Sequence, residues 1–241
     1  MTIVRFDSLE STNKYCEALE LAEVEDFTCY WALEQTAGVG QRGNHWEAAP
    51  GQNLTFSLVL HPEFLPAERQ FNLTEALSLS LVDFLSSFHF PLPISIKWPN
   101  DIYVDGKKIC GTLTSTRLQG SQIASTICGI GLNVNQREFP DWVPNPTSLT
   151  LLTGQQYDLE SLLRRLLACI KGRYDALRIG ANLEPEYLEY LLNLGVEAHY
   201  KYKEEEIVAT ITGVDPHGRL LLDTHDGHHL CCGMKEVALL P

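Results

Sequence analysis

A run of strand patterns between residues 94 and 134 constrains the fold more than any other part of the sequence. Apolar and polar residues alternate at its start, which is the period of a half-buried strand, until Pro99-Asn100 ends the alternation. Asp105-Gly106 is a strong hairpin signal, and Gln119-Gly120 is a second turn. Because short turns join antiparallel neighbours, this region predicts three antiparallel strands that follow each other as a meander.

Strand and helix patterns are mixed in the rest of the first 192 residues. Strands are predicted at residues 3–7, 28–34 and 54–60, and residues 36–53 are predicted to form a loop. Helices are predicted from Ser11-Thr12-Asn13 to Leu21, from Thr74 to Leu85, from Asp158 to Tyr174, and from Pro185 to Gly195. Strands and helices do not alternate regularly, so we predict an α+β domain whose mixed or antiparallel sheet has flanking helices.

From Val196 onward the sequence contains short strand patterns only. Ile207, Ala209 and Ile211 alternate with polar residues, and turn residues follow at 216–218 and 226–227. We therefore predict a small C-terminal β-barrel, and divide the chain into domains 1–192 and 193–241.

Composition narrows the class of protein. The net charge of −13 argues against DNA binding, which needs Lys and Arg to neutralise phosphates. Neither a signal peptide nor an apolar run of the ~20 residues that cross a bilayer is evident, so no membrane association is expected. The seven scattered cysteines suit reduced thiols. The expected location is the cytoplasm.

The predicted loop carries a glycine-rich segment from Glu34 to Trp46. Closely spaced glycines let backbone N–H groups approach an anion, and Arg42 adds a positive charge. The alternative is an ordinary flexible surface loop.

Three further segments combine polar groups with strand ends. Lys97-Trp98-Pro99-Asn100-Asp101 ends one strand, where Asp101 and Asn100 are expected near the Lys97 ammonium; the alternative is a simple surface ion pair. Lys107-Lys108-Ile109-Cys110-Gly111 places a second lysine on the neighbouring strand, or else forms a solvated hairpin edge. Gly129-Ile130-Gly131 suggests that another group packs against the backbone, or that the strand has a bulge.

Together these segments resemble the biotin–protein ligases. The resemblance rests on Ser-Thr-Asn at 11–13, Gly38-x-Gly40-x-Arg42-Gly43-x-x-Trp46, Lys97-Trp98-Pro99-Asn100-Asp101, Lys108-Ile-x-Gly111 and Gly129-Ile-Gly-Leu-Asn133-Val-Asn. Their order and spacing agree over essentially the whole chain. The resemblance implies a class II synthetase-like catalytic domain followed by an SH3-like barrel. The pattern begins within the first ten residues, so we expect the short form, without the DNA-binding domain of longer members.

The resemblance also implies a reaction and roles for individual residues. Biotin and ATP are the implied substrates, with Mg²⁺ expected and no dedicated protein metal site, and the implied acceptor is the biotin carboxyl carrier domain of a carboxylase. The implied catalytic residues are Lys108, Lys97, Asp101 and Arg42. The implied biotin-binding residues are Ser11, Thr12, Asn13, Gln35, Gly38, Gly40, Lys108, Gly111, Gly129 and Gly131. The implied ATP- or adenylate-binding residues are Val39, Gly40, Gln41, Arg42, Trp46, Lys97, Asn100 and Asn133.

The sequence departs from the commonest family pattern at a few positions. Many members have arginines where this chain has Val39, Gln41 and Asn44, and Ser115 replaces a frequent glutamate. An arginine at 41 would contact the adenylate phosphate, whereas a neutral amide makes a weaker hydrogen bond. Either Arg42 compensates, or the intermediate leaves the enzyme more readily.

Several alternatives remain open. A related fold transfers lipoate or octanoate, although those families lack the segment at 97–101. The other alternative is a non-catalytic biotin-sensing or scaffolding protein, against which the intact Lys97, Lys108 and Asp101 argue. His225, His228, His229, Cys231 and Cys232 could together bind zinc, but strand alternation would point them to opposite sides. The sequence does not distinguish a monomer from a homodimer, nor identify the acceptor carboxylase.

Overall fold

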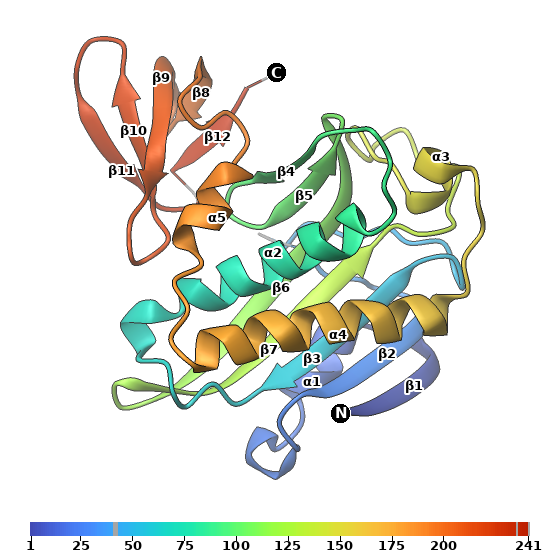
Figure 1. Cartoon of the computed structure of the whole chain (residues 1–241). Coiled ribbons are helices and arrows are strands. Elements are labelled where there is room, and N and C mark those ends of the chain that lie inside the picture. The colour runs from blue at the N-terminus through green and yellow to red at the C-terminus, as the bar shows by residue number, and fades with distance from the viewer. Residues whose placement is uncertain (41–42, 235, 241) are drawn as a thin grey trace.

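The computed structural model describes residues 1–40, 43–234 and 236–240. Its main feature is a seven-stranded sheet in the order β1-β2-β3-β7-β6-β5-β4 (Figure 1). The strands are β1 (Thr2–Leu9), β2 (Thr28–Gln35), β3 (Leu54–Leu60), β4 (Ile94–Lys97), β5 (Asp101–Val104), β6 (Lys107–Gln119) and β7 (Gln122–Leu132). β1 pairs with β2 in parallel and the other neighbours are antiparallel, so the predicted mixed sheet and meander are confirmed.

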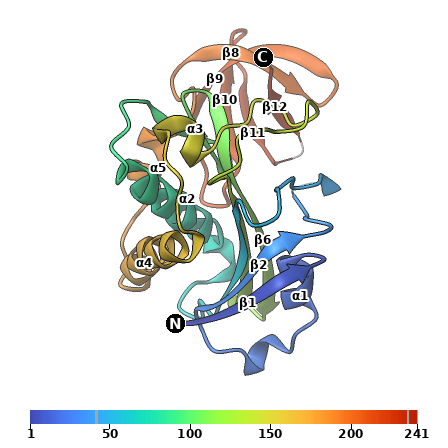
Figure 2. The same cartoon turned by 90° about the vertical axis from the view of Figure 1, so that its right-hand side faces the viewer.

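Helices cover the sheet unequally on its two faces. α2 (Phe71–Ser86) and α4 (Leu159–Arg178) pack together over one face, and α1 (Thr12–Glu17) lies on the other (Figure 2). Cys16 of α1 and Tyr30 of β2 belong to a small core beneath α1. With both faces covered, every residue of β3 is buried, which explains its nearly continuous apolar sequence.

The predicted helices are present, with different ends. The helix expected from Thr74 begins at Phe71, after the 3₁₀ turn η3 (Ala67–Arg69). The helix expected to reach Leu21 ends at Glu17, and Leu21 starts the separate 3₁₀ turn η1 (Leu21–Glu23). Two short helices, α3 (Leu149–Thr153) and α5 (Glu184–Glu189), are also present. Burial of Leu21 in the core beneath α1 requires the chain to turn there.

The C-terminal strands form a second, antiparallel sheet in the order β11-β10-β9-β8-β12. They are β8 (Glu197–Tyr202), β9 (Glu205–Val214), β10 (Leu220–Thr224), β11 (His229–Cys232) and β12 (Val237–Leu239). The α+β class with a separate C-terminal unit is confirmed. The predicted SH3-like β-barrel is present as an antiparallel sheet that is not closed, because within the described ranges no pairing joins β11 to β12. The domain boundary at 192–193 lies between α5 and β8 and stays a prediction.

Two hydrogen bonds hold the turn between β4 and β5 from outside the main sheet. The Trp98 indole Nε1 donates to the Gly218 oxygen at 3.0 Å, from the turn before β10. The Tyr187 hydroxyl, on α5, donates to the Pro99 oxygen at 2.8 Å. Gly218 has a φ of +78°, and a Cβ there would lie 2.1 Å from Phe71, so only glycine fits. The C-terminal unit thus braces the turn that carries Asn100 and Asp101.

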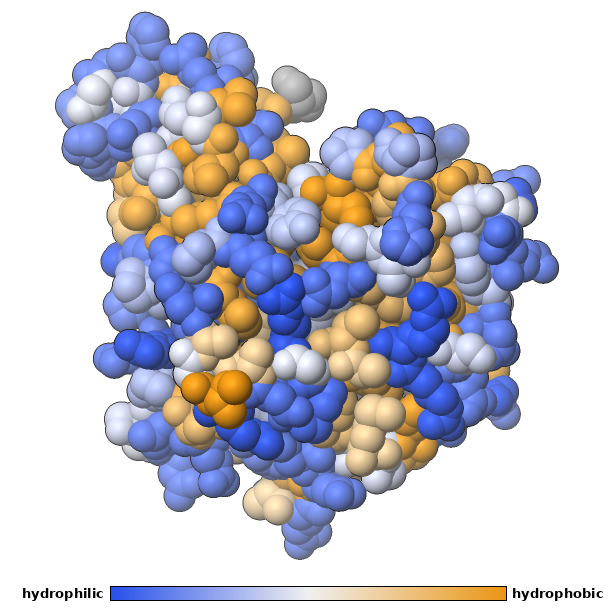
Figure 3. Space-filling model, in the orientation of Figure 1, coloured by the Kyte–Doolittle hydropathy of each residue, from blue (hydrophilic) through white to orange (hydrophobic). Residues whose placement is uncertain are grey.

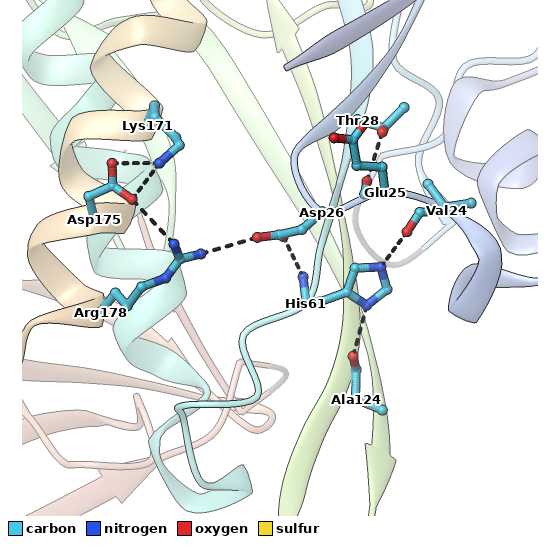
Figure 4. A network of polar contacts seen from close by, with 9 residues as sticks. All are labelled: Val24, Glu25, Asp26, Thr28, His61, Ala124, Lys171, Asp175 and Arg178. Carbon is cyan, nitrogen blue, oxygen red and sulfur yellow. Dashed lines mark hydrogen bonds and ion pairs between the residues drawn. The ribbon is translucent and has the colours of Figure 1, made fainter.

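A polar network joins the C-terminal end of α4 to the loop before β2 and to His61, which follows β3 (Figure 4). Arg178 contacts Asp26 at 3.1 Å, and the other Asp26 oxygen accepts the His61 backbone N–H at 2.8 Å. The His61 ring lies between the Val24 and Ala124 carbonyl oxygens, at 2.9 and 3.1 Å. Loop, strand and helix are therefore joined at His61, just after the C-terminal end of β3.

The outer face of the helices α2 and α4 is mainly polar. Figure 3 shows mainly hydrophilic residues over α2 and α4, with apolar residues gathered where the C-terminal strands meet the main body. In the part of the chain that the structure describes, none of the helices combines the length and apolar character needed to span a bilayer.

Arg173 joins three helices through ion pairs on both sides of its guanidinium. It contacts Asp83 of α2 at 2.7 and 2.8 Å, and Glu186 of α5 at 2.5 and 2.6 Å. Its side chain is 19% exposed. The Arg173 hydrogen bonds lower the pKa of Glu186 and raise that of Arg173 itself. A planar fork with two paired carboxylates has more geometric specificity than a lone ion pair.

We expect Arg173→Met to lower the free energy of unfolding by about 2–3 kcal/mol, because two carboxylates lose their shared cation. Since the pKa of Glu186 is depressed in the folded state, this contribution is present above its unfolded pKa and disappears as pH falls through the lowered folded pKa. Urea unfolding at several pH values measures the difference. Arg164→Met, which removes an exposed pair with Glu160 on the same helix, should cost under about 1 kcal/mol. Equal losses would contradict a special role for Arg173.

Candidate active site

A cavity of about 380 Å³ opens where the sheet, the loop before β3 and the C-terminal strands meet. Most of the predicted site residues line it. They are Ser11, Thr12, Asn13, Gln35, Val39, Gly40, Trp46, Lys97, Asp101, Lys108, Gly111, Gly129 and Gly131. Five separate segments of the sequence therefore converge on one cavity, as the resemblance requires.

The two lysines lie on this common cavity, and the contact of Asp101 differs from the prediction. The carboxylate was expected near the Lys97 ammonium, which is its cross-strand neighbour. Instead it contacts Lys108 Nζ at 2.5 Å, while Lys97 Nζ lies 5.7 Å from the centre of the Tyr103 ring. Both members of the Asp101–Lys108 pair are less than one-third exposed. The arrangement leaves Lys97 as a second cation beside a paired carboxylate.

Burial controls the other titratable groups close to these lysines. It raises the pKa of Tyr103 to about 12, with a smaller contribution from the Asp101 charge. Burial also raises the pKa of the Cys110 thiol. Both groups stay protonated at neutral pH, so neither supplies a base or a thiolate nucleophile to the cavity.

The glycines of β6 and β7 face side chains of the protein. A Cβ at Gly131 would lie 2.3 Å from the Trp46 indole, and one at Gly111 would lie 3.1 Å from it. A Cβ at Gly129 would lie 2.2 Å from the Asn13 amide. The prediction that another group packs on these glycines is right, but the groups are an indole and an amide. The Trp46 indole therefore covers the backbone at Gly131 and Gly111.

The segment from Gly38 to Trp46 has more structure than the predicted loop. Trp46 N–H donates to the Gly38 oxygen at 3.0 Å, and Gly40 N–H donates to the Asn44 oxygen at 2.7 Å. These bonds fold the two sides of the segment against each other. Residues 41–42 lie outside the described residues, so the predictions for Gln41 and Arg42 remain sequence-based.

Polar side chains from α1, β2 and β3 form one end of the cavity. Gln35 Oε1 accepts from the Thr12 backbone N–H at 2.8 Å and from the Thr12 hydroxyl at 3.1 Å. Ser57, which the sequence analysis missed, hydrogen bonds to Thr12 Oγ1 at 2.7 Å and also to Asn13 Oδ1. Ser57 occupies an ordinary alternating position in β3, so its sequence context carries no signal of this contact.

Asn133 and Trp46 line a second cavity, of about 550 Å³, on the other side of Lys108. Asn133 Nδ2 donates to the Thr147 oxygen at 2.9 Å, whereas its buried Oδ1 has no hydrogen-bond partner among the described residues. Trp142, also missed by the sequence analysis, lines this cavity and is 58% exposed. Asn133 thus has a buried amide oxygen beside this cavity without a partner among the described residues, and such an oxygen ordinarily accepts a hydrogen bond.

Among the predicted site residues that the structure describes, two lie outside both cavities. Asn100 is buried, and its amide donates to the Thr112 oxygen at 3.0 Å, so it holds the β4–β5 turn to β6. Gly38 lies between Gln35 and Trp46, where a Cβ would be 2.6 Å from the Trp46 oxygen. Asn100 and Gly38 therefore contact residues that line the cavity without lining it themselves.

The C-terminal histidines do not converge. His225, His228 and His229 contact Glu197, Asp226 and Asp223 respectively. Across residues 1–40, 43–234 and 236–240, no group of three or more His, Cys, Asp or Glu side chains could hold a metal ion.

A model of the biotin/lipoate A/B protein ligase family matches residues 5–133, more than half of the chain. The chain belongs to this family. A bifunctional ligase/repressor BirA of Bacillus subtilis is 30% identical over 230 residues, covering 93% of this chain and 70% of the relative. A biotin–[acetyl-CoA-carboxylase] ligase of Paracoccus denitrificans is 30% identical over 222 residues, covering 88% of this chain and 90% of the relative.

Solved structures extend the similarity to the complete biotin ligase fold. The biotin protein ligase from Aquifex aeolicus in complex with biotin and ATP has a TM-score of 0.81 and 28% sequence identity. The match covers 99% of this chain and 98% of that one, so it includes the C-terminal sheet. The resemblance based on five sequence segments is thereby confirmed at the level of family and fold.

Proposed function

We propose that the chain is an ATP-dependent biotin–protein ligase. A biotin carboxylate oxygen attacks the α-phosphorus of ATP, and the bond to pyrophosphate breaks, giving biotinyl-5′-AMP. The ε-amine of an acceptor lysine then attacks the acyl carbon, loses a proton and releases AMP. The observation that carries the proposal is one cavity lined by Lys97, Lys108 and a polar end built from Thr12 and Gln35.

The first step brings two anions together, so fixed cations must offset their repulsion. We assign Lys108 to the biotin carboxylate and the α-phosphate, and Lys97 to the nucleotide phosphates; Arg42 is assigned there from sequence alone. Lys108 is held by Asp101 at 2.5 Å, which fixes the ammonium at the junction of the two cavities. Such preorganisation avoids moving the charge during the reaction.

The two cavities suit the two substrates. The hydroxyls and amides of Ser11, Thr12, Asn13 and Gln35 can pair with the cyclic urea of biotin, which has two N–H donors and a carbonyl acceptor. On the other side of Lys108, Asn133 Oδ1 can accept from the amino group of adenine, beside Trp46. The polyphosphate then lies near the lysines between them.

Asp101 is assigned to the second step. The acceptor amine, with an ordinary pKa of about 10.4, is mostly protonated at neutral pH. Asp101 lines the cavity beside Lys108, where its carboxylate can accept a hydrogen bond from the incoming amine and hold or deprotonate it. This role is secondary to the charge that Asp101 provides for Lys108.

Mg²⁺ is expected to accompany ATP, but the described residues do not fit a dedicated site for it. Within the described chain, no set of three metal-ligating side chains gathers at the cavity, and Asp101 already pairs with Lys108. Such an ion would depend mainly on phosphate oxygens and water. No step of the proposal uses a protein-bound metal.

The proposed partner is the biotin carboxyl carrier domain of a biotin-dependent carboxylase. Location in the cytoplasm and independence from DNA are proposed from the sequence, and homodimerisation remains open.

Incubation with biotin, ATP and candidate carrier domains, followed by mass spectrometry, tests the function. The expected product gains one biotinyl group on one lysine. Transfer of lipoate or octanoate in place of biotin would favour the related family activity, and no transfer at all would favour a sensor.

Gln41 leads to a separate prediction about the intermediate. Because a neutral amide binds a phosphate more weakly than an arginine, we expect biotinyl-5′-AMP to dissociate about tenfold more slowly from Gln41→Arg than from the natural chain. Release of labelled adenylate from each protein, chased with unlabelled biotin and ATP, measures the rate. Gln41→Asn, which shortens the amide without adding charge, is the control. Equal rates for the natural chain and Gln41→Arg would remove this explanation of residue 41.

A further inference from the structure

Ser57 lies in β3 behind the polar end of the cavity. Its side chain is completely buried, at 0% exposure. It contacts two residues of α1, namely Thr12 and Asn13, which are 44 to 45 positions away in the sequence. A buried hydroxyl at this position reaches the cavity only through those two neighbours.

The contacts around Thr12 define a direction for each proton. The Thr12 hydroxyl and its backbone N–H both donate to Gln35 Oε1, at 3.1 and 2.8 Å. A hydroxyl has one proton, so Thr12 Oγ1 can contact Ser57 only as an acceptor, at 2.7 Å. Ser57 also has one proton, which it shares between Thr12 Oγ1 and Asn13 Oδ1, so hydrogen bonds run from Ser57 to both residues of α1 and from Thr12 to Gln35.

The direction of these hydrogen bonds determines which donor and acceptor atoms remain available to a ligand. With Oε1 of Gln35 accepting twice, Nε2 faces the Gly38 side, where it lies 3.1 Å from the position of a Gly38 Cβ. Thr12 Oγ1 keeps a remaining acceptor site at this end of the cavity, which the amide side chains of Asn13 and Gln35 also line. A cyclic urea has a carbonyl that needs donors and N–H groups that need acceptors, so it matches this set.

We propose that Ser57 is a positioning residue for the cyclic urea of biotin, acting through Thr12 and Asn13. The inference rests on the proposed function and adds a residue that does not itself touch the ligand. Without the Ser57 hydroxyl, Thr12 loses its incoming donor and can rotate away from Gln35. Asn13 Oδ1 loses the same partner, while its Nδ2 keeps only the long contact of 3.4 Å to the Leu113 oxygen.

Ser57→Ala tests the proposal, with Thr55→Val as the matched control. Thr55 is also buried in β3, and its hydroxyl donates to the backbone oxygen of Ala32 at 2.9 Å. We expect Ser57→Ala to raise the biotin Kd, measured by calorimetry, and the biotin KM by roughly three- to tenfold, with little change in the ATP KM or in kcat. Thr55→Val should leave all three unchanged.

Two further measurements separate positioning from a merely structural role. Desthiobiotin keeps the cyclic urea but lacks the sulfur ring, so its affinity should fall by the same factor as that of biotin in Ser57→Ala. In a Thr12→Val background, where the hydroxyl is already absent, Ser57→Ala should cause only a small additional loss. Full additivity of the two changes, or loss of biotin but not desthiobiotin binding, would overturn the proposal.

The result is distinguishable from failure of the proposed function. If the natural chain binds biotin and Ser57→Ala binds it equally well, only the role of Ser57 is wrong. If the natural chain binds neither biotin nor desthiobiotin, the proposed function fails first. Thermal unfolding of both variants checks that each is folded, so a loss confined to kcat with unchanged biotin binding also contradicts the proposal.

Discussion

Lys108→Ala is expected to abolish formation of biotinyl-5′-AMP, a loss of about a thousandfold or more in rate. The Lys108 ammonium lines both cavities and pairs with Asp101 at 2.5 Å, so it lies where the biotin carboxylate and the α-phosphate would meet. Its removal leaves two negatively charged substrates beside an unpaired carboxylate. Pyrophosphate release with biotin and ATP, together with chromatography of the adenylate, measures the first step alone.

Lys107 provides the control for this change. It precedes Lys108 in β6 but is exposed, so Lys107→Ala should retain nearly full activity. Circular dichroism and thermal unfolding establish that both variants are folded. Addition of synthetic biotinyl-5′-AMP to Lys108→Ala then isolates the second step, which should be less impaired than the first. Normal adenylate formation by a folded Lys108→Ala protein would refute the assigned role and weaken the proposed function.

The parts of the fold that were predicted from sequence depend on local signals. The antiparallel meander follows from alternation and from turns such as Asp105-Gly106, whose backbone φ is positive at both residues as such a turn requires. The long helix α4 begins where Asp158 accepts a hydrogen bond from the Ser161 backbone at 2.9 Å. Each signal acts within a few residues, so a single sequence is enough to read it.

The candidate site was predicted mainly from the family resemblance, and its contacts needed coordinates. A register shift in the β5–β6 pairing, between Ile102 and Tyr103, changes which side chains meet across these strands. Asp101 pairs with Lys108, not with its direct neighbour Lys97, and this choice between two lysines is not encoded in the local sequence. Ser57 and Trp98 were missed as structural supports because their partners lie about 45 and 120 positions away. Pairings at that distance leave no pattern in the local sequence.

Glu75→Gln is expected to stabilise the protein by up to about 3 kcal/mol at pH 8, and hardly at all at pH 4. Glu75 is 4% exposed on α2, and its Oε2 has no hydrogen-bond partner among the described residues. Burial, with a smaller effect of the Glu184 charge, raises the pKa of this carboxyl from 4.5 to about 7. Glutamine keeps the shape of the side chain and cannot ionise.

The pH dependence follows from this raised pKa. Below about pH 4.5 the carboxyl is protonated in both folded and unfolded chains, so it has no differential effect. Between about 4.5 and 7 the unfolded chain ionises while the folded chain holds its proton, and the folded state becomes progressively less stable. Above about pH 7 the penalty is complete, because a buried carboxylate lacks a partner.

Urea unfolding of the natural chain and of Glu75→Gln at pH 4, 6 and 8 measures this penalty directly. Glu68→Gln, an exposed carboxyl in the turn before the same helix, should change the free energy of unfolding by less than about 0.5 kcal/mol at every pH. A gain that is the same at pH 4 and pH 8 would mean that amide packing, not ionisation, stabilises the variant. A loss at pH 8 would mean that the Glu75 carboxylate is satisfied by water in the folded protein, and that its burial carries no cost.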